Sequence, residues 1–156
     1  MDIYTSYSVR IDRFTRIFQD TVTLYRQSVD FFIRVILLEK DSLFQLKTQN
    51  QRVNAVEQLT VSTKQRPEVR YDFGKKFYKF PSYLRRAAIA EALGAVSSYL
   101  SRLENWEKED SKVRGRKPGL PKAGFASPAF YKDNCYVRLS DYTARVKVWV
   151  RNTWDW

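Results

Sequence analysis

The chain has 156 residues, of which 44% are hydrophobic and 15% aromatic, so it can bury the core of one ordinary domain. Its 28 Lys and Arg outnumber its 17 Asp and Glu, and the formal net charge of +11 favours binding to polyanions, most commonly nucleic acid. The lack of histidine and the single cysteine, Cys135, exclude an internal disulfide, a thiolate metal cluster and the usual triad and zinc chemistries.

The sequence predicts neither a membrane span nor a secretory leader. No apolar run approaches the roughly 18 residues that a transmembrane helix needs. The N-terminal sequence MDIYTSYSVRID lacks the basic-then-apolar layout of a signal peptide. We therefore expect a cytoplasmic protein.

The N-terminal third predicts one strand followed by helices. Residues 3–11 alternate between apolar and polar side chains, which is typical of a half-buried strand. Asp12 can then cap a long amphipathic helix that runs from Phe14 to about Glu39. A shorter helix is predicted at 49–60, and the polar segment that follows it predicts a loop.

The stretch from Tyr71 to Trp106 first interleaves aromatic residues with cations and then becomes the clearest helix of the chain. Pro81 or Ser82 begins that helix, since proline is tolerated in a first turn and serine caps one. Its apolar residues recur at intervals of three and four and share one face: Ile89, Leu93, Val96, Leu100, Leu103 and Trp106. Before the helix, we expect the aromatic residues to divide into a core set (Phe73, Phe77 and Phe80) and a set available for stacking (Tyr78 and Tyr83).

Residues 111–128 combine cations with Gly and Pro, which predicts a flexible or extended basic linker. It is either a solvated connection or an arm that follows phosphates. After it, the pattern changes to short strands. The strands predicted there are Ala129–Tyr131, Tyr136–Ser140, Ala144–Arg151 with Val side chains on one face, and Trp154–Trp156 after a turn at Asn152 and Thr153.

Three blocks carry a resemblance to a known family: FPSYLRRAAIAEALGAVSSYLSRLENWEK, PGLPKAGFASPAFYKDNCY and ARVKVWVRNTWDW. They resemble the TnpB/OrfB proteins of insertion sequences, long called transposases. Those proteins are similar to type V CRISPR effectors and act as RNA-guided DNA endonucleases. The resemblance covers about half of the chain, from Phe80 to Trp156, and is weaker before it.

The resemblance implies an α+β fold in which a helical recognition bundle is inserted into a small antiparallel β-barrel of the oligonucleotide-binding kind, the wedge domain. Residues 1–11 and 129–156 would supply the barrel strands, residues 12–110 the helical insertion and residues 111–128 the linker. The family's RuvC-type nuclease domain, where a divalent metal such as Mg²⁺ is held, has no counterpart here. We therefore expect a chain truncated before that domain, without a cofactor of its own.

The function implied is to hold guide RNA and target-adjacent DNA, with no membrane and no small-molecule substrate as partner. Lys and Arg would contact phosphates, and aromatic rings would stack on unpaired bases. The residues predicted to bind nucleic acid are Lys75, Lys76, Tyr78, Lys79, Tyr83, Arg85, Arg86, Lys112, Arg114, Arg116, Lys117, Lys122, Arg145, Lys147 and Arg151.

Two other functions stay open at this stage. A basic structural protein, or one that binds an anionic surface, would use the same cations. An enzyme in its own right is disfavoured, because the chain has no histidine and no carboxylates that converge in the predicted elements.

Overall fold

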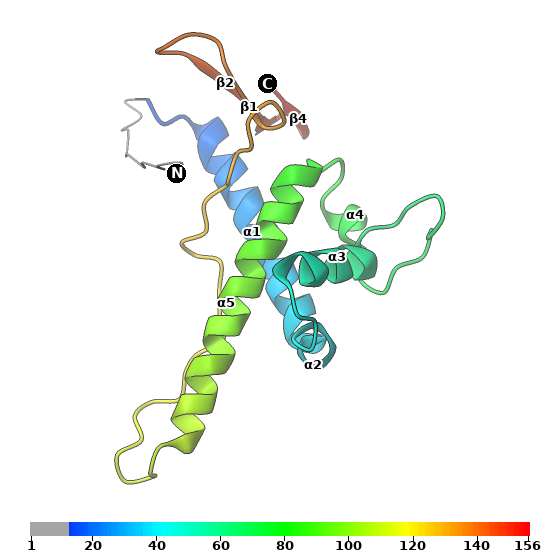
Figure 1. Cartoon of the computed structure of the whole chain (residues 1–156). Helices are drawn as coiled ribbons and strands as arrows, with labels where there is room; N and C mark the ends of the chain where they lie inside the picture. The colour runs from blue at the N-terminus through cyan, green and yellow to red at the C-terminus, as the bar shows by residue number, and fades with distance from the viewer. Residues whose placement is uncertain (1–12) are drawn as a thin grey trace, which may run out of the picture.

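The computed structural model describes residues 13–156, and the strand predicted at residues 3–11 lies outside this range. Two long helices pack at the centre of the molecule, and two small β-hairpins lie at one end of them (Figure 1). In chain order the elements are α1 (Arg16–Leu38), α2 (Lys40–Leu43), α3 (Gln49–Thr60), α4 (Phe73–Lys76), α5 (Ser82–Lys108), β1 (Tyr136–Arg138), β2 (Ala144–Val146), β3 (Val148–Val150) and β4 (Thr153–Asp155).

Helices α1 and α5 form the main core. Both begin near the hairpins and run away from them, and the second half of α5 extends beyond the other helices (Figure 1). The buried positions of α1 recur every three or four residues and therefore share one face; they include Tyr25, Val29, Phe32 and Ile36. The facing positions of α5 include two small residues, Ala88 and Ala92, which allow the two helices to pack closely.

The two long helices and the shorter one predicted from the sequence are confirmed. The helix expected from Phe14 to Glu39 is α1, but it begins at Arg16 with Thr15 at its N-cap, so the predicted cap at Asp12 is wrong. Helix α5 begins at Ser82, as predicted. The helix expected at 49–60 has those bounds in α3, where Thr48 and Gln51 form a capping box. In that box Gln51 N–H donates to Thr48 Oγ1 over 3.2 Å, and Thr48 N–H donates to Gln51 Oε1 over 3.0 Å.

The predicted oligonucleotide-binding-like barrel is wrong. Within residues 13–156 the strands form two separate antiparallel pairs, β1 with β2 and β3 with β4. A barrel needs every strand paired on both edges, whereas each of these strands pairs on one. The helices are therefore no insertion into a barrel: they form the core, and the hairpins attach at one end. The short strand predicted at 129–131 is not formed either.

The barrel fails because the predicted strand at 144–151 divides in two. Before Lys147 the chain pairs with β1, and beyond it the chain pairs with β4. Between the two, Lys147 N–H donates to the carbonyl of Cys135 over 2.8 Å. The two turn residues of the second hairpin, Arg151 and Asn152, have φ of 50° and 59°, as a two-residue type I′ turn requires.

A cluster of aromatic rings joins α1, α4, the start of α5 and β4. Phe73, Phe77 and Phe80 are buried, as predicted. The Phe73 ring stacks on Phe32 and Phe77, with centroids 4.8 and 4.6 Å apart, and Phe80 packs edge-on against Trp154 at 4.9 Å. A helix of one turn is unstable in isolation, so this packing is what holds α4 in place.

The linker after α5 docks on the helices through its second half. It turns back beside α5 and towards the hairpins (Figure 1). Asp30 Oδ1 accepts a hydrogen bond from Ala123 N–H over 2.8 Å, and Arg26 Nε donates to the carbonyl of Ala126 over 2.9 Å. Ala123 and Ala126 are both buried. This half of the linker is therefore extended, as the sequence allowed, but it is anchored.

Replacing Phe73 with Ala should lower the free energy of unfolding by about 3–5 kcal/mol, because a cavity opens where four other phenylalanine rings meet it. Urea denaturation followed by circular dichroism measures the change. Phe125→Ala is the matched control, since that ring is fully exposed and its loss should change stability by less than about 0.5 kcal/mol. Equal losses in the two variants would contradict this role for Phe73.

Candidate nucleic-acid interface

Most cations of the described residues have no carboxylate beside them. Residues 13–156 contain 27 Lys and Arg, and seven of these form ion pairs with acids of the same range. Twenty are therefore left without such a partner there. A surplus of this size produces a strongly positive field, and where it gathers decides what the protein can bind.

The first gathering of cations is the α4 corner, which we define as Lys75, Lys76, Tyr78 and Lys79. Burial of Phe73 and Phe77 turns the residues between and after them outwards, and all four residues of the corner are exposed. Tyr78 is 66% exposed, and Lys79 Nζ lies 5.2 Å from the centroid of its ring. The corner therefore presents three ammonium groups and one aromatic face to solvent.

The segment that leads into the α4 corner is held on the helices. Glu39 Oε1 accepts a hydrogen bond of 2.7 Å from Tyr71 Oη and pairs with Arg70 Nη1 over 2.7 Å. The hydrogen bond to the Glu39 carboxylate raises the pKa of Tyr71 above its usual value. Asp72 then caps α4 by accepting from Lys75 N–H over 3.2 Å. These contacts hold the backbone of the α4 corner in place on the helices, with its four side chains turned to solvent.

The β3–β4 hairpin adjoins the α4 corner. The Phe80–Trp154 contact joins the two, because Phe80 follows the corner directly in the chain. The hairpin adds the exposed Arg151 in its turn, and Lys147 before it, whose Nζ lies 5.1 Å from the ring centroid of Trp156. Two of the three basic stretches predicted from the sequence therefore meet near the start of α5.

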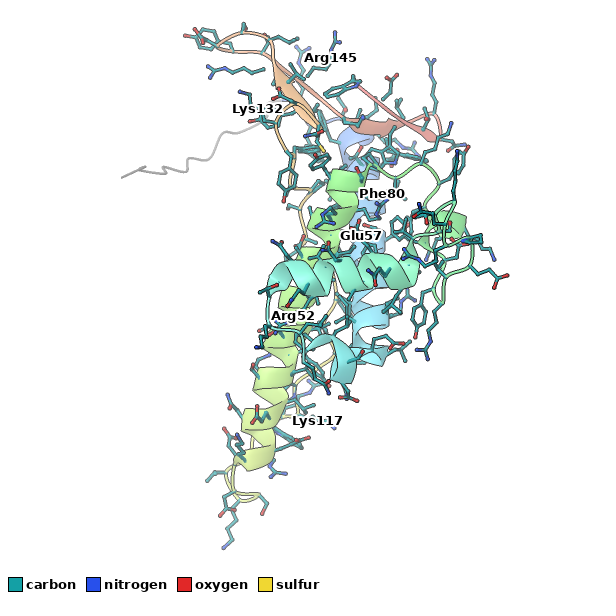
Figure 2. The ribbon with its side chains drawn as sticks, turned by 45° about the vertical axis from the view of Figure 1, so that its right-hand side comes forward. Arg52, Glu57, Phe80, Lys117, Lys132 and Arg145 are labelled. Carbon is teal, nitrogen blue, oxygen red and sulfur yellow. The ribbon has the colours of Figure 1, made fainter. Side chains whose placement is uncertain are left out.

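The third basic stretch lies elsewhere. Lys112, Arg116 and Lys117 are exposed near the far end of α5, a helix whose 27 residues span about 40 Å. Figure 2 shows Lys117 towards that end and Arg145 on the hairpin side of the molecule. Lys122 is exposed where the linker docks near α1. The predicted site residues thus do not form one continuous surface.

Arg85 and Arg86 are both neutralised by Glu57, although the Arg86 side chain stays 40% exposed. Arg85 Nη2 pairs with Glu57 Oε1 over 3.1 Å, and Arg86 Nη1 pairs with Glu57 Oε2 and also donates to Asn54 Oδ1 over 3.2 Å. The side chains of Arg85 and Glu57 are only 18% and 19% exposed. These two arginines connect α5 to α3, so their role in the structure is to hold two helices together.

Arg114 is also committed to the fold. Its Nη2 donates to the carbonyls of Glu107 and Glu109, each over 2.9 Å, at the C-terminal end of α5. Its guanidinium carbon lies 4.6 Å from the ring centroid of Trp106, and Trp106 Nε1 donates to the carbonyl of Gly115 over 2.7 Å. The first turn of the linker is therefore closed onto the helix end, where a cation is favourable.

Sequence analysis missed two residues of the hairpin end, Tyr131 and Lys132. Both are exposed, and the Tyr131 ring contacts the predicted stacking residue Tyr83, with centroids 5.7 Å apart. The sequence does contain a pattern that points to these residues, because Tyr131-Lys132 repeats the tyrosine–lysine pair of Tyr78-Lys79. The prediction of a barrel strand at residues 129–131 conceals this pattern.

Within residues 13–156, no cluster of three or more Asp, Glu or Cys is placed to hold a metal ion. None of the helices in that range combines the length and the apolar character that crossing a membrane requires.

Comparison with known proteins places the chain in a family. The Aq_aa04 family matches residues 5–150. The chain belongs to the Aq_aa04 family. One relative is "Uncharacterized protein aq_aa04" of Aquifex aeolicus (strain VF5), 30% identical over 137 residues, which cover 80% of this chain and 75% of the relative. No solved structure matches the chain. Neither name links this Aq_aa04 family member to TnpB/OrfB proteins, so that resemblance stays a prediction.

Glu57→Gln should lower the free energy of unfolding by about 1–3 kcal/mol, because two guanidinium groups lose the carboxylate that both contact. Asp41→Asn removes a carboxylate from an exposed pair with Lys40 and should cost less than about 1 kcal/mol. Urea denaturation of both variants at low salt makes the comparison. The assignment of Arg85 and Arg86 to helix packing is wrong if the Glu57 variant is as stable as the Asp41 variant.

Proposed function

We propose that this protein binds nucleic acid, with its contacts centred on the α4 corner and the adjoining β3–β4 hairpin. One observation carries the proposal: cations that have no carboxylate partner among residues 13–156 lie beside exposed aromatic rings at this surface. The cations are Lys75, Lys76, Lys79, Lys147 and Arg151, and the rings are those of Tyr78 and Trp156. Lysine and arginine contacts with phosphates supply the affinity and make it depend on salt.

Local charge alone does not separate this surface from the end of the linker. From 61 to 86 the chain has eight cations and two acids, and Glu39 and Glu57 pair with three of the cations, which leaves five cations against two acids. From 102 to 122 there are seven cations and four acids, an excess of three as well. What favours the start of α5 is that Lys147 and Arg151, with the exposed rings of Tyr78 and Trp156, add to the cations there.

Structured RNA is the first ligand to test, because the TnpB/OrfB resemblance implies a guide RNA together with target-adjacent DNA. We also propose that the protein is cytoplasmic and that it binds RNA and DNA together. The chain would contribute binding alone, and a divalent metal would be held only in the nuclease domain of TnpB/OrfB proteins. The proposed function does not need the barrel, since the cations named above lie on α4, in the turn after it, and in or directly before the β3–β4 hairpin.

Changing Lys75, Lys76 and Lys79 together to Gln should weaken binding to a labelled RNA hairpin about 10-fold or more in low salt. It should also lower the slope of log affinity against log salt by about 2–3, because three phosphate contacts are lost. Fluorescence anisotropy across a salt series measures both quantities. The matched control replaces Lys112, Arg116 and Lys117 with Gln, which removes the same charge at the far end of α5.

The control should weaken binding several-fold less than the α4 triple variant. Equal effects would show that net charge, and not the α4 corner, drives binding. If the wild-type protein fails to bind RNA or DNA at low salt, the proposal is wrong. If it then also floats with anionic vesicles, a function at an anionic surface is favoured instead.

A further inference from the structure

We infer that the ligand is single-stranded at its point of contact, and that Tyr83 and Tyr131 form the platform on which its bases stack. This inference rests on the proposed function and names the form of nucleic acid that the site takes. The two side chains are 44% and 49% exposed, and their ring centroids lie 5.7 Å apart with the planes tilted by 48°. They join into one aromatic surface that faces solvent.

Each ring is held by a fixed piece of backbone. Tyr83 lies in the first turn of α5, between the helix start and the fully buried Leu84. The carbonyl of Tyr131 accepts hydrogen bonds from the N–H groups of Asn134, Cys135 and Tyr136, over 3.3, 2.8 and 3.3 Å. Cys135 is itself completely buried. The turn therefore sets the position of Tyr131, so that little ordering is needed when a base arrives.

The surroundings of the platform fit a single strand. Lys132 follows Tyr131 and is exposed, and Tyr78 with Lys79 lies five residues before Tyr83, so further rings and ammonium groups lie close along the chain. Stacked bases of a single strand expose their faces in turn, while phosphates run beside them. In a duplex the base faces are already covered, and only the phosphates remain for the protein. The tyrosines should therefore strengthen binding to single strands and leave duplex binding unchanged.

The test uses fluorescence anisotropy of the full chain with a labelled 12-residue oligouridine, the matching oligothymidine and a 12-base-pair duplex. Wild-type protein should bind both single strands more tightly than the duplex. Tyr83→Ser and Tyr131→Ser should each weaken single-strand binding by roughly 5- to 150-fold, the range expected for one lost stacking contact. Tyr83→Phe and Tyr131→Phe keep the ring and should bind nearly as wild type does.

Phe125→Ser is the control, since it removes a fully exposed ring from the linker and should change no affinity. A second measurement needs no variant: in 0.5 M NaCl, where phosphate contacts are screened, the affinity of wild type for the single strands should fall by a smaller factor than its affinity for the duplex. Equal affinities for single strand and duplex, with Ser variants that bind as tightly as wild type, would overturn the platform and leave the proposed function standing. No binding to any of the oligonucleotides would end both.

Discussion

The constraint on which the rest of the structure depends is the burial of Phe73, Phe77 and Phe80 against α1 and Trp154. These rings hold a one-turn helix and the following segment between the two long helices and the second hairpin. Because the phenylalanines alternate with cations, anchoring them turns the α4 corner to solvent. One hydrophobic interaction thus completes the core and, in the same step, presents the charged surface to which we assign binding.

The positive charge of the chain serves two purposes. Part of it stabilises the fold: Arg85 and Arg86 join α5 to α3 through Glu57, while Arg26 and Arg114 fix the two ends of the linker. The larger part has no acid beside it among residues 13–156. Net charge alone does not distinguish these two groups of cations, because an arginine already paired with a carboxylate in the fold has little capacity left for a phosphate.

The sequence predicted the helices well because their signals are local. The three- and four-residue spacing of apolar residues in α1 and α5 depends only on neighbours along the chain. What the sequence did not predict depends on distant partners. Alternation at 144–151 fixes an extended backbone but not which strand it pairs with, and this is where the barrel prediction went wrong. The Glu57 ion pairs and the Tyr83–Tyr131 contact likewise exist only after segments 28 or more residues apart have packed together.

We propose that nucleic acid lies against the start of α5, the α4 corner and the hairpins. Photocrosslinking of the protein to RNA that contains 4-thiouridine, followed by mass spectrometry of the tryptic peptides, tests this claim most directly. The account predicts adducts in residues 71–83 and 131–156. Adducts confined to residues 102–122, at the opposite end of α5, would contradict it.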